Sequence, residues 1–233
     1  MPQDVEEFSS LEYACANWRK QVKRYTPLVL LALVAFVAAQ AGATNLITNG
    51  DFGTNDFTGW TIGTTGNGTW GSGYPIVTGW PLGGMNAAEG EVGEVNFSGV
   101  QEGGTLTQSF MSAGGAATVS LDWAVMGPGG NADGGEFTIL LNGTQIAQYD
   151  TGSINGSQLY NGVLTANANL LNGSNTLEID VTRRYITVPD GTPYQWVTGV
   201  DVEGQGVPEP GSLVLMGSGV LGLAGVLRRK IGF

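Results

Sequence analysis

Apolar and polar residues alternate in several short stretches in the middle of the chain. In residues 118–125, TVSLDWAV, every second side chain is large and apolar, and residues 136–150 repeat this pattern on both sides of Asn142-Gly143. A period of two predicts a strand with one buried face, and Asn-Gly is the dipeptide best suited to a tight hairpin turn. Further strands are expected at 105–110, 175–186 and 196–202.

The fold class follows from these strands and from what separates them. Between residues 44 and 206 no window shows a helical period, and Gly and Asn are frequent throughout. We therefore predict an all-β domain, a β-sandwich of about eight antiparallel strands. Residues 59–84 depart from the pattern, because they carry aromatic side chains among glycines and prolines and are expected to form loops.

The amino-terminal residues 1–43 have the pattern of a secretory signal peptide. Four basic residues precede an apolar run at 27–39, and small residues follow it. Cleavage after Ala41 or after Ala43 fits equally well, and an uncleaved anchor helix is the alternative. The sandwich domain is then expected to occupy residues 44–203.

The carboxyl-terminal end carries a second apolar segment. Residues 212–227 are mostly apolar or small, and a basic tail at 228–233 follows them. Sixteen residues give a helix of roughly 24 Å, slightly short of a full membrane crossing. We predict a linker at 204–211, a transmembrane sorting helix at 212–227 and a cytoplasmic tail.

The charge of the central segment limits its partners. Between residues 44 and 206 the only cations are Arg183 and Arg184, against fifteen Asp and Glu, so the net charge is −13. Such a surface repels phosphate backbones and anionic lipid, and nucleic-acid binding is therefore not expected. Neutral sugars and divalent cations are the remaining partner classes.

Several kinds of catalysis are excluded by composition. The chain has no His, its one cysteine is Cys15, and residues 44–206 contain no Lys. Thiol nucleophiles, Ser–His relays, zinc sites built on His or Cys, and Schiff-base lysines are therefore absent. Without a cysteine pair the domain must be held by its core or by a bound ion.

The start of the domain resembles a known family. Asn45, Leu46, the run 49–52 (NGDF) and Trp60 resemble the first motif of galactose-binding-like jelly rolls, which include many carbohydrate-binding modules. The stretches TLTQSF and WVTGVDVEG resemble the family's second motif and its final strand. The resemblance implies a jelly-roll sandwich that binds carbohydrate.

Two positions depart from the family pattern. Gly53 stands where the family has Glu, and Thr198-Gly199 stand where it has an Asp pair. Because those acids often help hold a structural calcium in the family, the resemblance leaves that ion in doubt, with Asp201 as a substitute ligand after a register shift. No other cofactor is expected.

The tail resembles a second, more specific family. Val207-Pro208-Glu209-Pro210, the short apolar segment and the basic cluster Arg228, Arg229 and Lys230 resemble the PEP-CTERM sorting signal. This resemblance implies an exported protein of a Gram-negative bacterium that makes exopolysaccharide. An exosortase, a membrane-embedded processing enzyme, would recognise the tail, so the inner membrane holds the chain only transiently. The implied destination is the cell surface or extracellular matrix.

Aromatic side chains are the candidates for sugar recognition, because they stack on the apolar faces of pyranose rings. The candidates are Trp70, Tyr74, Trp80, Tyr194 and Trp196. The alternative for each is burial in the core, as expected for most large aromatics. We assign Trp60 and Trp123 to the core directly.

Acidic clusters give two weaker candidates. Asn131, Asp133 and Glu136 offer oxygen ligands of the type that calcium takes, although a solvated turn explains them better. Glu89, Glu91 and Glu94 contain enough carboxylates for glycoside hydrolysis, but their close spacing favours a solvated face.

The sequence thus predicts an exported, non-enzymatic protein that binds carbohydrate, such as an exopolysaccharide of the matrix. The alternative is a structural matrix or biofilm protein without a discrete ligand. Exposed aromatics in a groove would favour the first hypothesis, and burial of all five candidates would favour the second.

Overall fold

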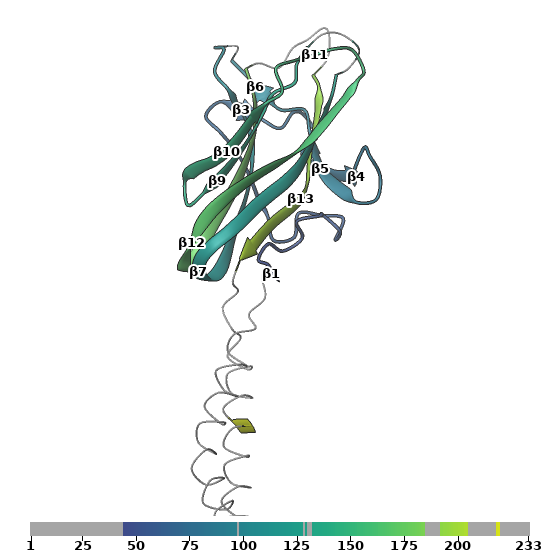
Figure 1. The fold of residues 1–233 in the computed structure, drawn as a ribbon. Coiled ribbons are helices and arrows are strands. Elements are labelled where there is room, and N and C mark those ends of the chain that lie inside the picture. The colour runs from purple at the N-terminus through teal and green to yellow at the C-terminus, as the bar shows by residue number, and fades with distance from the viewer. Residues whose placement is uncertain are drawn as a thin grey trace, which may run out of the picture. The chain divides into compact units, whose positions relative to one another are not determined.

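The described part of the chain is a β-sandwich (Figure 1). The computed structural model describes residues 44–96, 98–127, 129, 132–184, 192–204 and 218–219. The predicted signal peptide with its cleavage sites, the Pro-Glu-Pro motif and the basic tail lie outside these residues, as does almost all of the predicted sorting helix. Within the described residues, no helix combines the length and apolarity needed to cross a membrane.

Eight strands of four or more residues build the described domain, and every strand pair is antiparallel. They are β2 (Thr61–Thr64), β4 (Ile76–Gly79), β5 (Asn86–Gly90), β7 (Glu102–Met126), β9 (Glu136–Leu141), β10 (Thr144–Asp150), β12 (Leu159–Arg183) and β13 (Tyr194–Gly204). Two-residue strands are β1 (Thr44–Asn45), β3 (Gly68–Thr69), β6 (Gly93–Glu94), β8 (Ala132–Asp133) and β11 (Ser153–Ile154). The predicted all-β class is confirmed.

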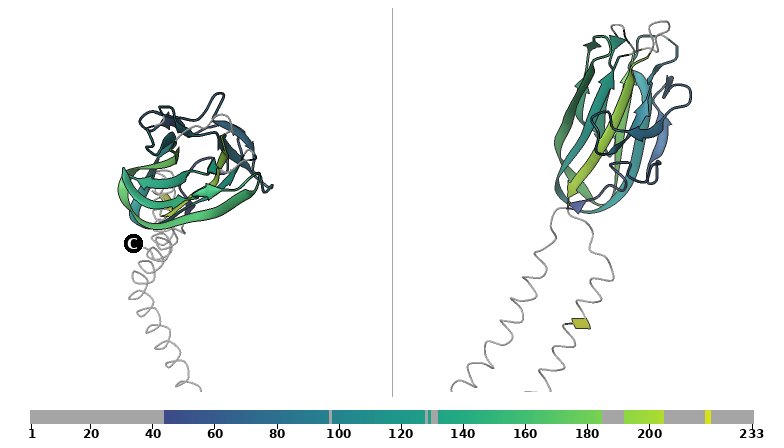
Figure 2. Two further views of the ribbon diagram at one scale, coloured as in Figure 1. Left: turned by 90° about the horizontal axis from the view of Figure 1, so that it is seen from above. Right: turned by 90° about the vertical axis from the view of Figure 1, so that its right-hand side faces the viewer.

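Strands β7 and β12 pair along their whole length and run through both layers of the sandwich (Figure 2). The first half of β7 pairs with β2, and the second half of β12 pairs with β9, which pairs with β10. The second half of β7 pairs with β13, and β5 and β4 follow. The two long strands therefore connect the layer β10-β9-β12-β7-β2 to the layer β12-β7-β13-β5-β4.

Glycines lie where the long strands pass from one layer to the other. Gly114, Gly115 and Gly173 have φ angles of 84°, 99° and 108°, in the left-handed region that glycine adopts without steric cost. The segments 105–110 and 118–125, predicted as separate strands, are consequently parts of β7. The predicted hairpin is confirmed, because Asn142 and Gly143 both have positive φ between β9 and β10.

A single apolar core lies between the layers. Leu106 comes from the first layer and Val119 and Val197 from the second, and all three are at most 1% exposed in one cluster. Trp60 and Trp123 belong to the same cluster, as predicted. Burial of such side chains stabilises a fold by about 2 kcal/mol each, so this cluster holds the domain together without disulfides.

The family-like opening motif has a structural role. Asn49 has a φ of 54°, and its Nδ2 donates hydrogen bonds to the carbonyl oxygens of Asp56 (2.9 Å) and Thr58 (3.2 Å). Trp60 Nε1 donates to the Asn49 carbonyl oxygen over 3.0 Å, and the Trp60 ring stacks on that of Phe52. The motif therefore closes its own loop and anchors it in the core.

Candidate functional site

The outer face of β4, β5 and β13 brings together residues that are far apart in sequence. Trp196 on β13 lies opposite Glu89 on β5, and Glu89 lies opposite Ile76 on β4, so the three side chains share one face. Trp196 Nε1 donates to Glu89 Oε2 over 2.9 Å, and Thr78 Oγ1 donates to the same oxygen over 2.6 Å. Two donors therefore fix the position of this half-buried carboxylate.

A second apolar cluster supports this face from within. Trp80, Ala87, Ala124 and Trp196 are buried together, separate from the core between the layers, and Met126, Leu159 and Tyr194 pack against them. A turn positions Trp80, because its N–H donates to the Met85 carbonyl oxygen and its own carbonyl oxygen accepts from Gly83. Trp80 and Trp196, each 6% exposed, therefore form the support of the face rather than its outermost surface.

Two tyrosines border the same face. Tyr194 is half-buried, and its ring centroid lies 5.8 Å from that of Trp196 at an interplanar angle of 38°. Tyr74 is half-buried and packs against the core between the layers. Burial, followed by the charges of Glu91 and Glu89, raises the pKa of Tyr74 to about 12, so its hydroxyl remains a hydrogen-bond donor.

We call the set Tyr74, Glu89, Glu91, Tyr194 and Trp196 the aromatic-carboxylate face. Three of its members were sugar-binding candidates from the sequence, whereas its two acids were considered for hydrolysis and assigned to a solvated face. Their spacing of two residues was the available signal, with Glu89 on β5 and Glu91 directly after the strand's last residue, Gly90. Glu94 is separate: it is fully buried and accepts hydrogen bonds from the N–H groups of Ser98 (2.6 Å) and Gly99 (3.0 Å). The solvated-face interpretation is therefore wrong for Glu94.

Trp70 belongs to the core between the layers. Its side chain is 4% exposed, and its Nε1 donates to the Gly63 carbonyl oxygen over 2.9 Å. The ring packs so closely on Gly104 that a Cβ there would lie 1.9 Å from a ring atom. Because neither ring face is open, the interpretation of Trp70 as a sugar platform is replaced by a structural one.

The calcium candidates do not come together. Among the described residues, no group of three or more acidic, His or Cys side chains is arranged to hold a metal ion. Asp133 Oδ1 accepts from the Gly135 N–H, and Glu136 Oε1 accepts from Thr138, so both act locally. Burial, followed by the charge of Glu203, raises the pKa of Asp201. The described acids among these candidates are therefore not grouped as a metal site, and Asn131 lies outside the described residues.

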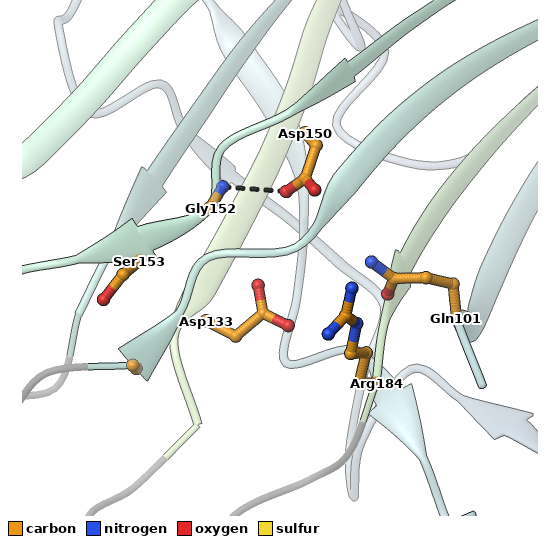
Figure 3. A pocket seen from close by; sticks show the side chains of 7 residues that line it. Gln101, Asp133, Asp150, Gly152, Ser153 and Arg184 are labelled. Carbon is orange, nitrogen blue, oxygen red and sulfur yellow. Dashed lines mark hydrogen bonds between the residues drawn. The ribbon is translucent and has the colours of Figure 1, made fainter. Parts of the chain in front are cut away.

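A polar pocket of about 360 Å³ lies among loops near β8 and β11 (Figure 3). It is lined by Gln101, Ala132, Asp133, Asp150, Gly152, Ser153 and Arg184. Arg184 points into the space between Asp133 and Gln101, and Asp150 accepts a hydrogen bond from the Gly152 N–H over 2.8 Å (Figure 3). The pocket offers hydrogen-bonding groups, but its described lining has no aromatic side chain for stacking.

The carboxyl-terminal pattern matches a family model. Residues 206–230 match the PEP-CTERM protein-sorting motif. The chain carries a PEP-CTERM sorting motif. The sequence prediction for this segment is thereby confirmed, and the boundaries of the neighbouring segments remain predictions. No curated protein matches the chain by sequence.

The domain is similar in fold to solved carbohydrate-binding modules. TmCBM61 in complex with beta-1,4-galactotriose is 12% identical, with a TM-score of 0.42, covering 69% of this chain and 98% of that one. A family 35 module from an environmental isolate is 18% identical, with a TM-score of 0.31, covering 64% of this chain and 99% of that one. At this similarity the ligand of this chain has to follow from its own residues.

Proposed function

We propose that this protein is exported, sorted through its PEP-CTERM motif, and binds carbohydrate through the aromatic-carboxylate face. The observation that carries the proposal is the position of Tyr194 and Tyr74 beside a carboxylate held by Trp196. Aromatic rings supply stacking surfaces for the apolar faces of a sugar, and carboxylate oxygens accept hydrogen bonds from its hydroxyl groups.

The orientation of Glu89 suits this role. Its Oε2 is occupied by Trp196 and Thr78, while its Oε1 makes no hydrogen bond with the described part of the chain. Oε1 is therefore available to a ligand, and the carboxylate needs no rearrangement to accept a hydroxyl. A preorganised acceptor lowers the entropic cost of binding.

The face does not have the usual arrangement of a glycosidase. Glu89 lies on β5 and Glu91 directly after it, and no contact among the described residues places the two carboxyl groups across a bond from each other. Hydrolysis uses two carboxyl groups on opposite sides of the scissile bond. Binding without turnover is therefore the function that this geometry supports better.

Glycan binding by the full-length protein in mild detergent tests the proposal. We expect at least one polysaccharide of a panel to be retained, and Tyr194→Ala to weaken binding about ten-fold through the lost stacking surface. Tyr149→Ala, which removes an exposed tyrosine from β10, is the matched control and should leave binding unchanged. Failure to retain any glycan would refute the proposal.

The burial of Trp70, Trp80 and Trp196 favours the structural alternative. In that case the acidic domain contributes packing and hydration to a matrix without a discrete ligand. The same panel separates the two, because a structural protein would retain no glycan and the Tyr194 variant would behave like the wild type.

A further inference from the structure

Among the described residues, the aromatic-carboxylate face has two acids and no neighbouring base to compensate them. Glu89 lies on β5 and Glu91 directly follows the last residue of that strand, and both charges act on the Tyr74 hydroxyl. Acids on one surface with no partner cation create a negative potential there. A ligand of that face therefore enters a negative field.

The rest of the domain cannot neutralise this field. Residues 44–206 contain two basic side chains, Arg183 and Arg184, and no Lys or His. Arg183 is fully buried, and Arg184 lines the separate polar pocket. An anionic glycan would thus meet repulsion at the face without an ion pair to offset it.

A glycan with free amines has the complementary chemistry. A protonated amine can approach Glu89 Oε1, which makes no hydrogen bond with the described part of the chain. The ring of Tyr194 can also attract a cation, because aromatic faces carry negative charge density. Charge-assisted hydrogen bonds are about twice as strong as neutral ones.

We propose that the aromatic-carboxylate face selects a cationic amino-sugar polymer with free amines over N-acetylated and anionic glycans. This inference rests on the proposed function, because it names the ligand class of the same surface.

The test compares two ligands that differ in charge. Binding of a glucosamine oligosaccharide and of its fully N-acetylated counterpart to the full-length protein is measured at mildly acidic pH, where the free sugar amines are protonated. We expect the free-amine ligand to bind about ten-fold tighter, and the preference to decline as salt rises. A polyuronate of similar length should not bind.

Charge-neutralising variants locate the effect. Glu89→Gln with Glu91→Gln should abolish the preference for the amine, whereas Glu203→Gln, an exposed acid on β13, should preserve it. Because Glu89→Gln disturbs two hydrogen bonds, Glu91→Gln alone is the second variant and should reduce the preference by about half on a logarithmic scale.

Each outcome decides between the two proposals. Equal binding of the amine and N-acetyl ligands, or equal loss of preference in the Glu203 variant, overturns the charge inference and leaves carbohydrate binding intact. Absence of binding to these ligands and to every neutral glycan of the panel overturns both.

Discussion

Trp196 Nε1 and Glu89 Oε2 are joined by a hydrogen bond of 2.9 Å between neighbouring strands β13 and β5. Thr78 on β4 donates to the same oxygen, so three strands meet at one carboxylate. The bond joins a buried ring to a half-buried acid. It thereby links the apolar cluster beneath the face to the polar groups at its surface.

The two donors to Glu89 are expected to be energetically coupled. Trp196→Phe should lower the free energy of unfolding by about 2 kcal/mol, because a hydrogen bond to a charged group is lost. Thr78→Val should cost about 1 kcal/mol, and the double variant should differ from the sum by at least about 0.5 kcal/mol, since both donors share one oxygen. Urea denaturation measures all three values. Strict additivity would contradict the shared contact.

Close packing of Trp70 on Gly104 predicts a strong steric effect. Gly104→Ala places a Cβ 1.9 Å from the ring, so Trp70 must shift or the strands must separate. We expect a loss of about 2–3 kcal/mol in the free energy of unfolding, measured by urea denaturation. Gly79→Ala is the control, because nothing lies within 4 Å of its added Cβ. Equal stability of both variants would show that Trp70 does not pack on Gly104.

Strands with alternating apolar and polar residues could be predicted from the sequence. Features that depend on contacts between strands could not. The strands around Val119, Ile139 and Ile179 were predictable, because one apolar face per strand requires a partner layer. The continuity of β7 was not predictable from that pattern, because Gly114 and Gly115 read as a turn although they bend one strand.

The candidate site was predictable only in part. The aromatic residues of the sequence identified Tyr74, Tyr194 and Trp196 as candidates. The residues next to them in sequence do not distinguish them from Trp70, which is buried and packs on Gly104. Glu89 gains its place through strand register with Trp196, a relationship between residues more than a hundred positions apart. Register of this kind depends on the whole sheet rather than on any short stretch.

The raised pKa of Asp180 predicts that the folded state loses stability as the pH rises. Burial first, then the neighbouring Glu178 and Glu136, raises the pKa of Asp180 to about 7 from 3.8. Because the folded state binds the proton more tightly, this contribution is fully present below about pH 4 and is lost as the pH rises to about 7. Across the sheet Asp180 pairs with Thr138 and Thr105, which bring no positive charge.

The variant Asp180→Asn isolates this effect. At pH 8 its free energy of unfolding, measured by urea denaturation, should exceed that of the wild type by about 1–2 kcal/mol after allowance for partial exposure. The difference should disappear near pH 4. Glu203→Gln serves as the control for removing an acid elsewhere. A gain of equal size at both pH values would contradict the titration of Asp180.

The sorting motif predicts that the tail is removed in the native host. The segment 212–227 is shorter than a full membrane crossing and rich in glycine, which disfavours a stable permanent anchor. Pro208-Glu209-Pro210 precedes it within the matched segment. We expect the intact mass of the mature protein to lack residues 212–233. The double variant Pro208→Ala, Pro210→Ala should retain them and stay in the membrane fraction, because the processing enzyme no longer recognises the chain. A wild-type protein that keeps its tail would show that the segment is an anchor rather than a sorting signal.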